Sequence, residues 1–341
     1  MDTLRPHANA AAALLAALLL AGCETLSYYV QAVGGQVALM SSTRPVSELL
    51  ADPATPTPLR ERLILARAIR EYAVKDLKLP DNSSYRGYAD IGRPYAVWNV
   101  VAAPEFALEP LQSCFPVAGC VTYRGFFAQD AAERHAVRLR EQGNDAYVYG
   151  VAAYSTLGRF DDPLLSTFIR YPDADLARLI FHELAHQVTY VQDDSTFNES
   201  FAVVVEREGV QRWLAATGRG AEQKELLAAE QRNKTFVSEV EQSRARLRVL
   251  YRQRIAAEAM RERKQAELTA LRGKLAAYPR FKDVAPNNAF LASFATYTEL
   301  VPTFEHLLQE EGGDLARFYS RVKTYAARPP AERGPLSVAG K

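Results

Sequence analysis

The sequence feature that most constrains this chain is the apolar stretch LIFHELAHQVTY at residues 179–190, which contains the pattern His-Glu-x-x-His. No helix breaker interrupts the stretch, so a helix is expected there. On a helix, residues four apart lie ~40° apart around the axis and ~6 Å along it, so His182 and His186 can converge on one ion. Glu183 can then reach a water molecule bound to that ion. Two buried imidazoles without an ion would be costly, so the pattern predicts a zinc site rather than a core helix with incidental histidines.

A catalytic zinc site needs another protein ligand, and the segment NESFA at residues 198–202 offers Glu199. This segment resembles the NExxA element of the gluzincins, in which a glutamate on the following helix completes a set of two histidines and one glutamate. The metzincin pattern is absent. Glu199 also fits a capping box with Thr196, in which its carboxylate would turn back to the Thr196 backbone N–H. Asp193 and Asp194, on the intervening turn, are the fallback ligands.

Residues beyond the ligands are predicted to support the chemistry. Glu206 lies two helical turns beyond the predicted glutamate ligand, ~10 Å along the axis, so it cannot easily share the ion. It can steady His182 or His186, meet a substrate amine, or simply pair with a nearby arginine. Hydrolysis also needs a donor for the oxyanion that forms on the substrate. Tyr297, in an apolar helical stretch, is the candidate for this role, and His306 is the second choice.

The N-terminus carries a separate signal. Arg5 precedes an Ala/Leu run at residues 10–21 that is too short to span a bilayer comfortably, and the run ends in LAGC. This ending resembles a bacterial lipobox, in which residues 1–22 are removed as a signal peptide and Cys23 carries a lipid anchor. Glu24 is not the aspartate of an inner-membrane retention signal, so we expect the outer membrane of a bacterial envelope, facing the periplasm. The alternative is a buried N-terminal helix with an incidental cysteine.

Two features precede the histidine motif. Cys114 and Cys120 flank a Pro/Gly turn, and an oxidising periplasm would let them form a small-loop disulfide, with two free buried thiols as the alternative. The segment YSTLG is placed to bind substrate backbone as an edge strand, although a strand end and turn explains it equally well. Its residues are Tyr154, Ser155, Thr156, Leu157 and Gly158.

The remaining patterns predict an α+β fold that is predominantly α. Strands are expected at residues 96–102, 119–126 and 146–153, with a helix at 129–141 between the last two. These strands should form a small mixed sheet, packed on a gluzincin-like pair of helices that holds the metal site. The second helix of that pair is expected at residues 197–216.

We expect several regions along the chain. After the signal peptide come an N-terminal helical segment at residues 23–80 and a zinc peptidase core at 81–220. A long charged helical arm at 221–280 follows, and C-terminal helices at 281–341 close the core. The arm should be a helical hairpin whose charges form a solvated face, and it offers a docking surface for an envelope protein partner.

Composition narrows the classes of partner. The 341 residues are 48% hydrophobic and 24% charged, which is typical of a globular chain with a sizeable core. The net charge is only +1, and the arginines of the arm are interspersed with glutamates. No nucleic-acid partner is therefore expected.

Taken together, the lipobox, YSTLGRFDDP, FHELAHQ, NESFA and the charged helices resemble a bacterial family described as "Putative aminopeptidase". The resemblance covers most of the mature chain and implies a zinc-dependent exopeptidase of gluzincin type that acts on peptides. In this interpretation His182, His186 and Glu199 hold Zn2+, and Glu183 is the general base. Aminopeptidase action comes from the resemblance alone. The alternatives are an envelope endopeptidase and a noncatalytic scaffold lipoprotein with a structural zinc.

Overall fold

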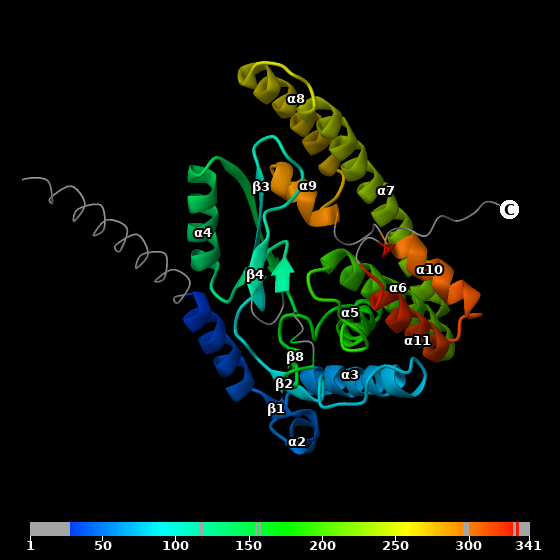
Figure 1. Ribbon diagram of the computed structural model, residues 1–341. Helices are drawn as coiled ribbons and strands as arrows, with labels where there is room; N and C mark the ends of the chain where they lie inside the picture. The colour runs from blue at the N-terminus through cyan, green and yellow to red at the C-terminus, as the bar shows by residue number, and fades with distance from the viewer. Residues whose placement is uncertain are drawn as a thin grey trace, which may run out of the picture.

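The structure is a computed structural model that describes residues 28–115, 119–153, 156, 158–295, 300–329 and 332–333. Helices dominate this part of the chain, and the strands form two small three-stranded sheets and one hairpin (Figure 1). The expected α+β class with a predominance of helix is confirmed. Within the described residues, none of the helices combines the length and the apolar character that crossing a bilayer requires.

A helix at residues 28–41 comes first, and ten more follow it in the described chain. These are α2 (Val46–Ala51), α3 (Thr57–Lys75), α4 (Gln129–Glu141), α5 (Asp173–Ala185), α6 (Ser195–Ala216), α7 (Gly220–Tyr251), α8 (Ala257–Leu275), α9 (Asn288–Ala295), α10 (Val301–Glu310) and α11 (Leu315–Ala326). The strands are β1 (Arg44–Pro45), β2 (Gly87–Ala89), β3 (Val97–Pro104), β4 (Ser113–Phe115), β5 (Gly119–Val121), β6 (Arg124–Phe126), β7 (Asn144–Val151) and β8 (Leu164–Leu165).

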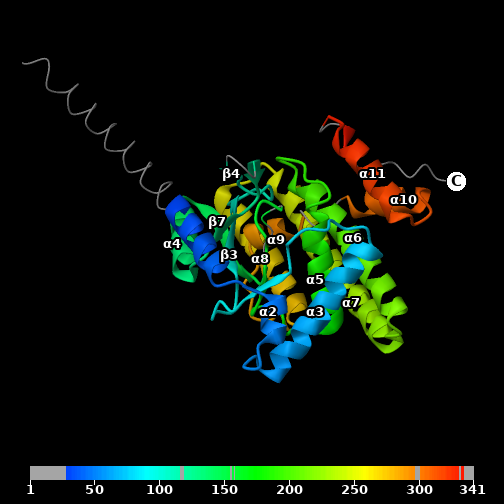
Figure 2. The same cartoon turned by 90° about the horizontal axis from the view of Figure 1, so that it is seen from below.

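The packing of α5 against α6 is central to the fold. Figure 2 shows α3, α5 and α6 side by side. Asp173 is the first residue of α5, and its negative charge is stabilised there by the positive end of the helix dipole. Its carboxylate pairs with Arg62 of α3 and with Arg219 just beyond α6. The apolar face of α5 follows helical spacing, and its buried residues are Leu176, Ala177, Ile180, Phe181, Leu184 and Ala185.

The start of α6 differs from the expectation by two residues. The side chain of Asp194 accepts a hydrogen bond from the backbone N–H of Phe197 at 3.0 Å, which makes it the N-cap. The helix therefore begins at Ser195 instead of residue 197, and the capping box on Thr196, which was the alternative role for Glu199, is not formed. This places Glu199 in the second turn of α6, facing α5.

An aromatic cluster packs α6 against α10. Phe197 and Phe201 of α6 pack against Phe304 of α10, with ring centroids 5.0 and 5.8 Å apart. All three rings are fully buried, and burial of each large apolar side chain contributes roughly 1.5–3 kcal/mol. Because Phe197 and Phe201 flank Glu199 in sequence, this packing fixes the rotation of α6 about its own axis and so the direction of the Glu199 side chain.

The larger sheet has the order β6-β3-β7, with both pairings antiparallel. Helix α4 covers one face, and α9 packs on the other and also contacts α7 (Figure 1). The strand expected at residues 119–126 is split: β5 pairs with β4 in a hairpin, and β6 alone joins β3. The disulfide between Cys114 and Cys120 lies across that hairpin.

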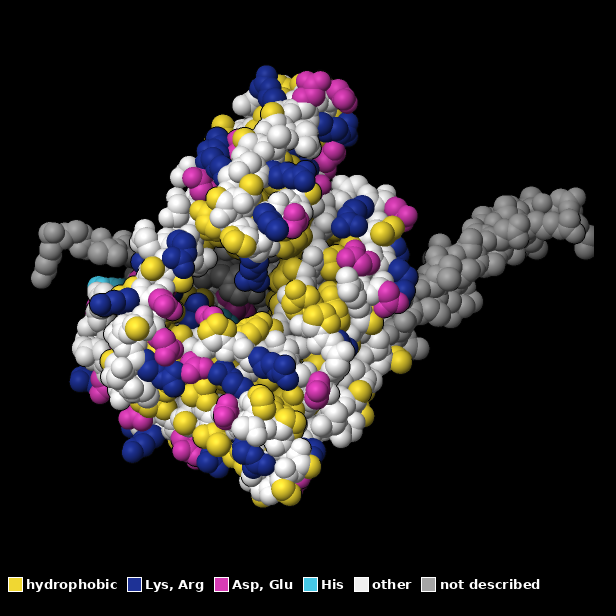
Figure 3. Space-filling view, turned by 180° about the vertical axis from the view of Figure 1, so that it is seen from behind, with side chains coloured by type: hydrophobic (Ala, Val, Ile, Leu, Met, Phe, Trp, Pro, Cys, Tyr) yellow, Lys and Arg dark blue, Asp and Glu magenta, His cyan; other side chains and the backbone are white. Residues whose placement is uncertain are grey.

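The expected charged hairpin is formed by α7 and α8. Arg246 of α7 and Glu267 of α8 pair at 2.8 Å, and buried Leu247 and Leu268 belong to the apolar cluster between the helices. Figure 3 shows basic and acidic side chains interspersed over this end of the molecule, as expected for a solvated face. The hairpin is not detached, since Lys264 pairs with Asp145 of β7 at 2.7 Å.

Gly209 lies where α6 approaches its neighbours closely. A Cβ at this position would lie 2.8 Å from Leu77 and 2.9 Å from Phe181 of α5. We expect Gly209→Ala to lower the free energy of unfolding by about 1–3 kcal/mol, because the added methyl overpacks the interface. The measurement is the midpoint of chemical denaturation.

The matched control is Gly273→Ala in α8, where no atom lies within 4 Å of the added carbon. This change should be neutral or stabilising by up to about 1 kcal/mol, because alanine favours the helix. Equal effects of the two substitutions would contradict the tight approach at Gly209.

Candidate metal centre

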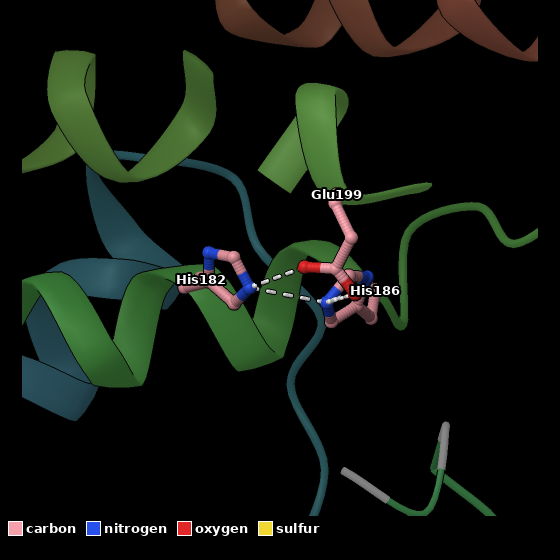
Figure 4. Close-up of side chains that lie close together, drawn as sticks. All are labelled: His182, His186 and Glu199. Carbon is pink, nitrogen blue, oxygen red and sulfur yellow. Dashed lines mark hydrogen bonds and ion pairs between the residues drawn. The ribbon is translucent and has the colours of Figure 1, made fainter. Parts of the chain in front are cut away.

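Three side chains converge where α5 ends and α6 begins. His182 lies in the last turn of α5, His186 is the residue that caps its C-terminus, and Glu199 comes from α6. Figure 4 shows the three side chains pointing toward one another. The two Nε2 atoms are 3.2 Å apart, and the Glu199 carboxylate lies 3.3 Å from His182 Nε2 and 3.8 Å from His186 Nε2.

This group fits a divalent cation. The ligand atoms of His182, His186 and Glu199 all lie within 4.8 Å of one another. Two ring nitrogens that face each other, with a carboxylate beside them, are a donor set that one shared cation satisfies. Among the described residues, no other His, Cys, Asp and Glu side chains form such a group. Three protein ligands leave a coordination position open, which is typical of catalytic rather than structural sites.

Glu206 holds His182 from behind. Its carboxylate lies 2.9 Å from His182 Nδ1 and 2.6 Å from the Arg178 guanidinium. Glu206 therefore contacts both a histidine and an arginine, which are two of the three roles that its place in the sequence left open. A carboxylate on Nδ1 fixes the ring so that Nε2 faces the site. Burial opposes ionisation of Glu206, but the charge of Arg178 and the bond to His182 lower its pKa to about 2.

The two histidines differ in charge. Burial lowers the pKa of His186 to about 4, so its ring is neutral at pH 7 and has a free lone pair. Burial also disfavours the cation of His182, yet the bonds from Glu199 and Glu206 outweigh it and raise the pKa of that ring. An incoming metal ion must therefore displace a proton from His182.

Glu183 is partly buried beside the group. Burial, opposed by the charge of His182, raises the pKa of its carboxyl to about 7. A carboxyl group with a pKa near the ambient pH is suited to accept and return a proton. This property marks Glu183 as a candidate general base on physical grounds beyond its place in the motif.

A cavity of about 400 Å³ lies between the ligand residues and the inner face of the β3 sheet. Glu183 and the three ligand residues form one wall. The opposite wall comes from strands and loops distant in sequence, with the side chains Val97, Asn99, Val121 and Tyr123, and helix 28–41 contributes Tyr28 and Ala32. No lysine or arginine lines the cavity in the described part of the chain. The His-Glu-x-x-His motif does not indicate which residues form these walls. The sequence holds one indication, because Asn99 is the sole polar residue in the apolar stretch at 96–104.

The proposed edge strand is a turn at its two described positions. The hydroxyl and the backbone N–H of Thr156 donate to the Asp162 carboxylate at 2.7 and 3.0 Å, and Gly158 has a φ of +74°. Strand β7 has already ended at Val151. Tyr154, Ser155 and Leu157 lie outside the described residues.

Tyr297 and Cys23 lie outside the described residues. His306 pairs with Glu310 on α10 and takes no part in the metal group. The fallback ligands are also used elsewhere: Asp193 accepts a hydrogen bond from the backbone N–H of Cys120, and Asp194 caps α6.

The fold and the site together define a helical protein with a candidate divalent-metal centre built around a His-Glu-x-x-His motif. A family model described as "Putative aminopeptidase" matches residues 27–336, so the chain belongs to that family. The family expected from the sequence is thereby confirmed. No curated protein and no solved structure matches the chain.

Removal of the Glu206 carboxylate should weaken metal binding. Glu206→Gln keeps the shape but loses the charge that orients His182, so we expect a 10–100-fold loss of affinity for an added divalent cation. Competition with a chelator measures the affinity. Glu208→Gln, two residues away and paired with Arg212, is the matched control and should bind normally. An unchanged affinity in Glu206→Gln would contradict the orienting role.

The raised pKa of Glu183 also predicts a dependence of stability on pH. Its folded-state pKa of about 7 exceeds the ordinary 4.5, so the protonated group favours the folded chain below pH 4.5, and this contribution is lost as the pH rises through 7. Metal-free Glu183→Gln should therefore be more stable than the metal-free native chain by about 1–3 kcal/mol at pH 8. The difference should approach zero at pH 4. Urea unfolding at both pH values measures it, and equal stabilities at pH 8 would refute the expectation.

Proposed function

We propose that this protein is a zinc-dependent aminopeptidase of gluzincin type, lipid-anchored at Cys23 to the outer membrane of a bacterial envelope. The observation that carries the proposal is the convergence of His182, His186 and Glu199 beside Glu183 in one buried cavity. The family description supports a peptidase. The open coordination position argues against a scaffold with a structural zinc.

His182, His186 and Glu199 would hold Zn2+. When bound, the ion polarises the peptide carbonyl and brings the pKa of a water molecule toward ~7. Glu183 accepts a proton from the attacking water while the water oxygen forms a bond to the carbonyl carbon of the peptide. Glu183 then passes this proton to the departing amine nitrogen as the C–N bond breaks. Glu206 keeps His182 in place throughout.

A phenol is the natural donor to the oxyanion. Tyr297 remains a candidate for this role, and Tyr123 and Tyr190, which line the cavity, are two further candidates. Burial, reinforced by the negative charge of Glu199, raises the pKa of both cavity phenols, so each retains its proton at neutral pH. A protonated phenol can donate a hydrogen bond where negative charge develops on the substrate.

The charge of the cavity favours action at the amino end of a peptide. The walls described here carry the carboxylates of Glu183 and Glu199 and no lysine or arginine. The carboxylate of a peptide C-terminus would find no lysine or arginine to pair with here, whereas the ammonium group of an N-terminus can pair with a carboxylate. This observation favours an aminopeptidase over a carboxypeptidase.

The surface of helix 28–41 supports the proposed anchor. Val30, Val33 and Val37 are 64%, 62% and 60% exposed, and they follow one side of the helix at three- and four-residue spacing. The helix begins shortly after Cys23, so a lipid on that cysteine would hold this apolar stripe close to a membrane surface.

Glu183→Gln tests the proposed reaction. The substitution should leave the zinc content unchanged, because Glu183 is not a ligand, and should lower kcat/KM for peptides by about 10²–10⁴-fold, because the general base is lost. Metal analysis and hydrolysis of a peptide library provide the two measurements.

Glu208→Gln, which makes the same change on the outside of α6, should retain activity. The proposal fails if Glu183→Gln keeps normal turnover. A comparison of each peptide with its N-acetylated form separates an aminopeptidase from an endopeptidase, since only an endopeptidase should accept both.

A further inference from the structure

One side of the metal cavity is lined by apolar side chains. They come from helix 28–41, from β3 and β7, from the β4-β5 hairpin and from the residue after β6. Six of them, which we call the apolar wall, are Ala32, Val97, Phe115, Val121, Phe127 and Val151. Val97 and Val121 are 7% exposed, and the other four are partly exposed to a larger extent. A ligand in the cavity can therefore contact them.

Contacts between separate elements fix the shape of the apolar wall. Val97 and Val151 are cross-strand partners in the register of β3 and β7. The backbone N–H of Phe127 donates to the side chain of Gln31 at 3.0 Å, which ties helix 28–41 to the sheet. A Cβ at Gly35 would overlap the Phe127 ring, so this glycine lets the ring lie against the helix. The apolar wall is thus formed without a ligand, as is usual for binding cavities.

The charged groups that line the cavity in the described chain all belong to the metal side. They are the carboxylates of Glu183 and Glu199 and the ring of His182, which holds a proton because Glu199 and Glu206 raise its pKa. The ring of His186 is neutral, since burial lowers its pKa to about 4. The polar and the apolar chemistry of the cavity are therefore separated.

The side of the cavity away from the metal group is neutral. Burial raises the pKa of the Tyr28 and Tyr123 phenols, so both keep their protons at neutral pH. Arg124 stacks on the Tyr28 ring, 4.0 Å from its centroid, but it lines a neighbouring pocket and not this cavity. A charged group placed against the apolar wall would lose hydration without an oppositely charged lining residue, whereas burial favours an apolar group there.

The position of the reacting bond decides which part of a peptide meets the apolar wall. In a peptide cleaved after its first residue, the attacked carbonyl carbon is bonded to the Cα that carries the first side chain. With that carbonyl at the metal group, the first side chain can extend across the cavity, while the rest of the peptide has to leave it. An apolar cavity of ~150 Å³ holds a benzene ring, so about 400 Å³ has room for one large side chain beside the amide.

We propose that the apolar wall binds the side chain of the first residue of the peptide, so that the protein removes N-terminal leucine, phenylalanine and similar large apolar residues. This inference rests on the proposed aminopeptidase function and adds to it the class of substrate. Ala32 limits the size of the side chain that fits, because it is the smallest member of the apolar wall.

A series of substrates with one leaving group and different first residues tests the preference. We expect kcat/KM of the full-length native chain to be about tenfold or more higher for leucine and phenylalanine than for alanine, because each further methylene is buried against the apolar wall. Aspartate and lysine substrates should be hydrolysed more slowly than the alanine substrate, because their charges are not paired there.

Ala32→Phe should reverse this preference. The added ring occupies the space for a large side chain, so kcat/KM should fall about tenfold or more for the phenylalanine substrate and much less for the alanine substrate. Ala38→Phe is the matched control, because residue 38 lies on the same helix and is exposed to solvent. It should keep the native order of substrates.

Val97→Thr provides a second, milder variant that keeps the β-branched shape suited to a strand. Its hydroxyl would be buried against an apolar side chain, so kcat/KM for the leucine substrate should fall about three- to tenfold. Val249→Thr makes the same change at a position that is 62% exposed on α7 and should have no effect.

Binding without turnover gives an independent readout. The full-length chain carrying Glu183→Gln is titrated calorimetrically with two tripeptide amides that differ only in their first residue, phenylalanine or alanine. The phenylalanine tripeptide should bind about tenfold more tightly, and addition of Ala32→Phe should abolish the difference.

The outcomes separate this inference from the proposed function. If the native chain hydrolyses peptides but treats leucine, alanine and lysine substrates alike, the role of the apolar wall is refuted and the aminopeptidase stands. The same holds if Ala32→Phe and Ala38→Phe show one order of substrates. If the native chain hydrolyses none of the substrates, the proposed function fails and this inference fails with it. A reversed preference in Ala32→Phe alone, with tighter binding of the phenylalanine tripeptide, supports the inference.

Discussion

The contact between α5 and α6 decides whether this chain has a metal site. The two histidines belong to one helix, but the carboxylate that faces them belongs to the next, and only the packing of the helices sets the separation of about 3–4 Å between His182 and Glu199. Gly209 lets α6 approach closely, and Phe197 and Phe201 fix its rotation. The local motif therefore supplies the ligands, and the core supplies their geometry.

The site concentrates charge in a buried place, and the surrounding structure offsets the cost. Glu183, Glu199 and Glu206 lie near one another, and the Arg178 guanidinium bonds to Glu206. Such a cluster is unfavourable without a cation, because burial penalises each charged group. The large apolar core around α3, α6, α10 and α11 balances this penalty. A chain that keeps such a cluster at the expense of stability is expected to use it.

The sequence predicts what local spacing determines and misses what long-range packing determines. His182 and His186 follow from helical geometry, and the helix at residues 129–141 is found with those bounds because its periodicity and its ends are both local signals. The strand at 119–126 was wrong as one element, since the hairpin at Cys120 is a tertiary feature. Asn99 and Gly125 are cross-strand neighbours only because of the register of β3 and β6, and the sequence around either residue does not indicate the other.

The helix at residues 28–41 is part of the cavity as well as the beginning of the described chain. Tyr28 and Ala32 line the cavity, and the side chain of Gln31 accepts a hydrogen bond from the backbone N–H of Phe127 at 3.0 Å. Gly35 fits beneath the ring of Phe127. Cutting the chain after this helix would thus leave the cavity with one side missing. Any shortened form intended for biochemistry has to retain the helix, even though the candidate metal ligands lie well over a hundred positions downstream.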